Sequence, residues 1–60
     1  MKHYHVSFMD DLGGIHAVKV WAHNPEEAEY KATEKINGMP LRHTFCQEDI
    51  VAVERILEGE

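Results

Sequence analysis

The sequence predicts an α+β fold, a three-stranded antiparallel sheet in the order β-β-α-β with one helix packed on one face. Two segments of alternating apolar and polar residues, 2–9 and 15–23, flank a glycine-containing turn. A capped helical segment follows at residues 25–37, and a last apolar segment at residues 49–57 supplies the third strand. Residues 1–60 contain no repeat, low-complexity tract or linker, so we expect a single domain.

The first two strands are predicted to form a hairpin, because only about five turn residues separate them. Side chains of a strand point alternately to the two faces of its sheet. One face then carries Tyr4, Val6, Phe8, Val18, Val20 and Ala22, and the other carries His3, His5, Ser7, Met9, Ile15, Ala17, Lys19 and Trp21. Pairing Phe8 with His16 sets Lys19 opposite His5 and Trp21 opposite His3.

The helix over residues 25–37 has clear signals at both ends. Asn24 is a good N-cap, Pro25 suits the first helical position, and the Glu27 carboxylate can reach back to the cap. One narrow apolar stripe faces the sheet and consists of Ala28, Ala32 and Ile36. Gly38 is expected to end the helix in a left-handed conformation, and Pro40 follows it.

The third strand, residues 49–57, carries apolar side chains on both faces. Strict alternation puts Val51, Val53 and Leu57 on one face and Ile50, Ala52 and Ile56 on the other. A right-handed crossover sets this strand parallel to the second strand and beside the first, which becomes the centre of the sheet. In the preceding segment, residues 41–45 are expected to be extended, and Phe45 and Cys46 are expected to plug an edge of the core.

A single helix covers one face of a sheet, so the other face is predicted to be bare. Trp21, Ile15, Ile50 and Ile56 are expected on it, and an apolar patch of this kind marks a partner-binding surface. Two alternatives remain: residues 41–47 fold over the face, or the register is shifted by one residue. A 60-residue chain gains stability from a partner, so a homodimer that stacks these faces or pairs an edge strand is also expected.

The histidines raise the question of a metal site. His3, His5 and His23 share one face, but Lys19 stands beside them, and His43 with Cys46 makes half a site at most. We expect no metal and no cofactor. Catalysis is not expected either, because no constellation of residues has assignable roles and a chain this short has little room for a cavity of about 300 Å³ or more.

The charge balance is acidic, with 11 Asp and Glu against 6 Lys and Arg. Direct binding to nucleic acid is therefore not expected, since it depends on clustered basic residues. Glu26 and Glu29 belong to a helix surface that is either a solvated face or a docking surface for a basic partner. The lone Cys46 and the lack of a long apolar run favour a cytoplasmic protein that does not enter a membrane.

Four segments, 3–6, 18–22, 25–28 and 51–55, together resemble small bacteriophage-encoded inhibitors of bacterial RNA polymerase. In that family, arginines of the last strand and acidic residues grip the polymerase. Only Arg55 falls near such a position here, and the neighbouring Glu54 departs from the pattern. The resemblance implies a non-enzymatic protein that inhibits or modulates a host enzyme, such as RNA polymerase or a CRISPR effector. The alternative is a small metal- or nucleic-acid-binding module.

Overall fold

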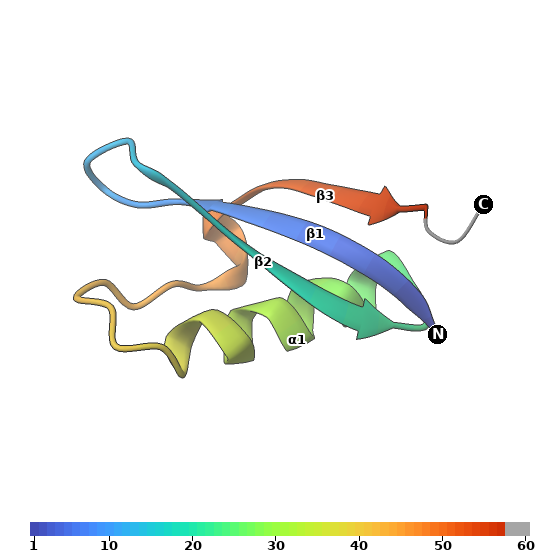
Figure 1. The fold of residues 1–60 in the computed structure, drawn as a ribbon. Helices are drawn as coiled ribbons and strands as arrows, with labels where there is room; N and C mark the ends of the chain where they lie inside the picture. The colour runs from blue at the N-terminus through green and yellow to red at the C-terminus, as the bar shows by residue number, and fades with distance from the viewer. Residues whose placement is uncertain (58–60) are drawn as a thin grey trace.

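A computed structural model describes residues 1–57 of the chain and shows the predicted order of elements (Figure 1). The elements are β1 (Lys2–Met9), β2 (Ile15–Ala22), α1 (Pro25–Asn37), the short 3₁₀ helix η1 (Gln47–Asp49) and β3 (Ile50–Ile56). The limits of β1 and α1 agree with the prediction. β2 ends one residue earlier than predicted, and β3 is one residue shorter at each end. The fold class is therefore confirmed.

The sheet has the order β2-β1-β3, and both neighbours of β1 run antiparallel to it. The predicted register of the hairpin is confirmed: Phe8 lies opposite His16, and Lys19 lies opposite His5. This register is fixed by the turn between the strands. The Asp10 carboxylate accepts the backbone N–H groups of Leu12 at 2.9 Å and Gly14 at 2.7 Å.

The start of α1 follows the prediction, but its end does not. The Asn24 side-chain oxygen accepts the N–H of Glu27 at 2.7 Å, as expected of an N-cap. The Glu27 carboxylate accepts from the backbone N–H of His23, one residue before the cap. Gly38 has a φ of −83° and is right-handed, so the predicted left-handed stop is wrong. Its N–H donates to the carbonyls of Glu34 and Lys35 instead, which closes the last turn without a special backbone conformation.

The core lies between α1 and one face of the sheet. Its fully or nearly buried side chains are Tyr4, Val6, Phe8, Val18, Val20, Ala22, Ala28, Ala32, Ile36 and Phe45. The helix contributes two alanines to this set, and because both are small its backbone lies close to the strands. All six strand residues of the hairpin expected on this face are in the core, so this face is as predicted.

Phe45 reaches the core from the segment between α1 and η1. It is 2% exposed, and its ring centroid lies 5.4 Å from that of Phe8. The Asn37 side chain holds it in place by accepting its N–H and donating to its carbonyl, both at 2.8 Å. Cys46 is exposed, so its predicted place in the core is wrong. Residues 41–45 form no strand, and the backbone N–H and carbonyl of Phe45 bind the Asn37 amide instead of a neighbouring strand.

One residue of β3 disagrees with the predicted faces. The pairing with β1 shifts between Ser7, which faces Ala52, and Phe8, which faces Ile50, so Val51 is an extra residue. A bulge of this kind turns the residues before it to the other face. Ile50 therefore packs against the core and does not lie on the bare face, where strict alternation placed it.

Candidate protein-binding surface

The face of the sheet opposite α1 is not covered by any segment within residues 1–57. Both α1 and the segment that carries Phe45 lie on the other side of the sheet (Figure 1). The expectation that residues 41–47 might fold over this face is therefore wrong. We call this surface the bare face, and its side chains are those of His3, His5, Ser7, Met9, Ile15, Ala17, Lys19, Trp21, Ala52, Glu54 and Ile56.

Strand pairing arranges most of the bare face in three rows that run across the sheet. The aromatic row is Trp21, His3 and Ile56, the charged row is Lys19, His5 and Glu54, and the small row is Ala17, Ser7 and Ala52. The rings of His3 and Trp21 stack with their centroids 4.2 Å apart and an interplanar angle of 5°. His5 Nδ1 lies 3.8 Å from Glu54 Oε1.

The structure brings some of the predicted binding residues together and separates others. Trp21, Ile15, Ile56 and Glu54 share the bare face, where Trp21 is 50% and Ile15 is 56% exposed. Four of the predicted residues lie elsewhere, and one of them is Ile50, which packs against the core. Arg55 pairs with Tyr4, on the other side of β3, and reaches the bare face only where it lines an open pocket with His3, Trp21 and Ile56. Glu26 and Glu29 stand on α1. The helix acids therefore form no surface in common with the bare face.

The outer edge of β2 is occupied by two lysines of α1. Lys35 Nζ donates to the carbonyl of Lys19 at 2.6 Å, and Lys31 Nζ donates to the carbonyl of Trp21 at 3.2 Å. Lysines on an edge strand oppose the addition of a further strand. A partner that paired with β2 would have to displace both amines, so the face of the sheet is more accessible to a partner than this edge.

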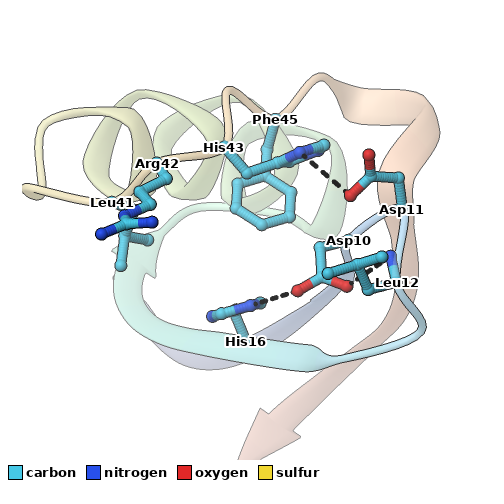
Figure 2. A pocket seen from close by; sticks show the side chains of 8 residues that line it. All are labelled: Asp10, Asp11, Leu12, His16, Leu41, Arg42, His43 and Phe45. Atoms are coloured by element: carbon cyan, nitrogen blue, oxygen red, sulfur yellow. Dashed lines mark hydrogen bonds and ion pairs between the residues drawn. The ribbon is translucent and has the colours of Figure 1, made fainter.

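Sequence reasoning missed an open pocket of about 300 Å³ at the far end of the hairpin (Figure 2). Its lining residues are Asp10, Asp11, Leu12, His16, Leu41, Arg42, His43 and Phe45. His16 Nε2 lies 2.8 Å from Asp10 Oδ2, and His43 Nδ1 lies 3.7 Å from Asp11 Oδ1. Phe45 contacts both imidazoles, with ring centroids 5.4 Å and 4.5 Å apart. The expectation of Phe45 as a core plug was the only signal that these segments meet.

Two histidine–carboxylate pairs line this pocket, and Cys46 is not among its lining residues. The Cys46 thiol points to the carboxylates of Glu48 and Asp49, at 3.4 Å and 3.6 Å. The hydrogen bond to Glu48 raises the pKa of Cys46 and favours the neutral thiol, which is the unreactive form. The pocket also lacks a metal centre, since residues 1–57 contain no group of three or more His, Cys, Asp or Glu side chains placed to hold one ion.

We expect the carboxyl group of Asp10 to have a pKa below its ordinary value of 3.8. The charged form accepts hydrogen bonds from the His16 side chain and from the backbone of Gly14 and Leu12, and these outweigh the effect of burial. Because the folded-state pKa is the lower one, the stability this group contributes is complete above about pH 4 and is lost as the pH falls through the folded pKa.

An NMR titration of Asp10 Cγ measures this pKa directly. In His16→Ala the Asp10 pKa should move up toward the ordinary value, because the largest cause of the shift is removed. If the Asp10 pKa measured in the wild-type protein were 3.8 or higher, the result would contradict the hydrogen bonds that the turn makes to this carboxylate.

Comparisons with protein-family models, with curated proteins and with solved structures gave no match. A search of residues 1–57 for a helix with the length and apolar character of a membrane span also found none. The function is therefore inferred from the surface of the chain itself.

Proposed function

We propose that this chain is a non-enzymatic protein-binding domain that occupies the surface of a partner protein with its bare face. The observation that carries the proposal is Trp21, a large aromatic side chain that is 50% exposed and is held flat by its stack on His3. An aromatic residue with a fixed conformation loses little entropy on binding, which is why tryptophan is enriched at the centres of interfaces.

The contribution of Trp21 to the binding free energy can be bounded from the area of its side chain. A buried aromatic side chain removes about 150–250 Å² from water, so covering the exposed half of Trp21 removes roughly 100 Å². At about 25 cal/mol per Å² this contributes about 2.5 kcal/mol, or between tenfold and a hundredfold in affinity. Ile15 and Ile56 add apolar area on the same face, so the patch supports binding without a deep cavity.

The partner class we propose is a bacterial host enzyme, such as RNA polymerase or a CRISPR effector, bound in the cytoplasm of the host. Support comes from the resemblance to phage-encoded inhibitors over most of the chain. The net charge of −5 steers the chain as a whole toward a basic partner, and Glu54 is the carboxylate that the bare face itself presents.

Trp21→Asp is expected to abolish capture of the partner, because it removes apolar area and places a charge at the interface. The measurement is a pull-down from bacterial lysate with identification and quantification of the bound protein. Tyr30→Asp is the matched control, since Tyr30 is also an exposed aromatic residue but stands on α1. Circular dichroism should show the same helix signal for all three proteins.

Two results would refute this proposal. One is the recovery of no specific partner with bait at about micromolar concentration, a level at which complexes of standard size are formed. The other is a partner that Trp21→Asp retains as well as the wild type does. Loss of the partner in Tyr30→Asp alone would move the binding surface to the helix.

A further inference from the structure

We propose that in the free protein the bare face is occupied by a second copy of the same chain. The two sheets stack face to face and are related by a twofold axis. This axis lies midway between the sheets and is parallel to β1. This inference rests on the proposed function in that both use the bare face, so a target protein and the second copy compete for it. The argument comes from the order of side chains in the three rows.

A twofold rotation about an axis along the central strand has a simple effect on the rows. It places β1 of one copy on β1 of the other, and β2 of one copy on β3 of the other. Each row keeps its position along the strands while its two ends change places. The end residues of a row therefore face each other across the interface, and the question is whether they are complementary.

The charged row is complementary to itself under this rotation. Its ends are Lys19 on β2 and Glu54 on β3. Each lysine then lies over the glutamate of the other copy, so the interface contains the same ion pair twice. Within residues 1–57 Lys19 has no ion pair of its own, and Glu54 is paired only with His5 at 3.8 Å. Placing opposite charges together in this way selects one orientation over others.

In the aromatic row and in the small row, the rotation also brings side chains of similar size to face each other. The rotation sets Trp21 over Ile56, so that large apolar side chains meet at both ends of the aromatic row. It sets Ala17 over Ala52, so that small side chains meet in the small row. Two stacked sheets lie about 10 Å apart, and side chains of both must interdigitate in that space.

Two other arrangements of the copies are less favourable. A twofold axis along the charged row would place Lys19 on Lys19 and Glu54 on Glu54, with like charges facing. Pairing through the outer edge of β2 would displace the amines of Lys31 and Lys35 from their carbonyls. Stacking along β1 meets neither obstacle, and it covers the exposed half of Trp21 in both copies.

Sedimentation of the wild-type protein from about 1 μM to about 1 mM should show a reversible monomer–dimer equilibrium. Lys19→Glu and Glu54→Lys should each weaken the dimer at least about tenfold, because like charges then face each other twice. The double variant carrying both exchanges should recover wild-type dimerisation within about threefold, since the pair is restored with its polarity reversed. Arg42→Glu is the control, because Arg42 is exposed in the segment that carries Phe45, on the other side of the sheet.

Dilution of the wild-type protein provides a second measurement that needs no variant to fold. Amide NMR shifts that change on dilution should be confined to bare-face residues and absent from the exposed side of α1. A chain that stays monomeric to about 1 mM overturns the dimer but leaves the proposed function to the Trp21→Asp pull-down. A dimer that the charge exchange fails to restore overturns the axis along β1. A dimer with no captured target supports this inference and refutes the host target.

Discussion

Phe45→Ala is expected to lower the free energy of unfolding by about 3–5 kcal/mol. The side chain is 2% exposed and packs against Phe8 and the imidazoles of His16 and His43, so its removal leaves a cavity at the end of the core. At 0.05–0.15 kcal/mol per residue, a chain of this length is stable by roughly 3–9 kcal/mol in total. The variant should therefore lose from about a third to all of the stability of the fold.

Urea denaturation followed by circular dichroism measures the loss. Leu41→Ala is the matched control, since Leu41 belongs to the same connecting segment but is 40% exposed and lies outside the core. It should change the free energy of unfolding by less than about 1 kcal/mol. A loss below about 1 kcal/mol for Phe45→Ala would show that the segment after α1 does not complete the core.

The hairpin and the helix were predictable because their signals are local. Residues 2–9 and 15–23 alternate strictly, and the short turn between them leaves only one register that puts the apolar side chains on one face. The start of α1 is marked by Asn24 and Pro25, whose preference for these positions depends on the backbone of the helix alone. The structure confirms these elements to within one residue.

The features that the sequence did not reveal depend on tertiary contacts. In β3 both faces are apolar, so nothing in the alternation marks Val51 as an extra residue; the bulge is seen only in the pairing of Ile50 with Phe8. Glycine is the residue type expected at a left-handed stop. The Gly38 N–H nevertheless donates to two helix carbonyls, and the Gly38 backbone is right-handed. Cys46 follows the buried Phe45, yet it is exposed and its thiol contacts Glu48 and Asp49.

The bare face was predictable in its main residues, whereas the pocket was not. Trp21, Ile15 and Ile56 follow from alternation once a single helix is assigned to the other face. The pocket joins the turn at residues 10–14 to the segment at residues 41–45, which are far apart in sequence. Their contact is set by Asn37 and Phe45, and no pattern in the sequence shows that an asparagine at the end of a helix will bind a particular backbone.

A larger side chain between α1 and the sheet is expected to lower the free energy of unfolding, and this is the second large effect that we predict. Ala32 is fully buried where α1 meets the sheet, and Val18 and Val20 are buried in the same core. Ala32→Leu adds three carbon atoms at this position, so the helix must move away from the strands or side chains must leave their preferred rotamers. We expect a loss of about 1–3 kcal/mol in the free energy of unfolding.

The sign of this effect separates packing from hydrophobicity. Leucine is more apolar than alanine and almost as good a helix former, so burial and helix propensity alone predict little loss or a gain. Urea denaturation of Ala32→Leu measures the outcome, with Glu34→Leu on the exposed side of α1 as the control for propensity. A gain in stability for Ala32→Leu would mean that the helix is loosely packed.

The bare face lies on the opposite side of the sheet, so the folded fraction of Ala32→Leu should capture the partner as the wild type does. If the folded variant fails to capture the partner, the arrangement of the bare face depends on how closely α1 approaches the strands behind it.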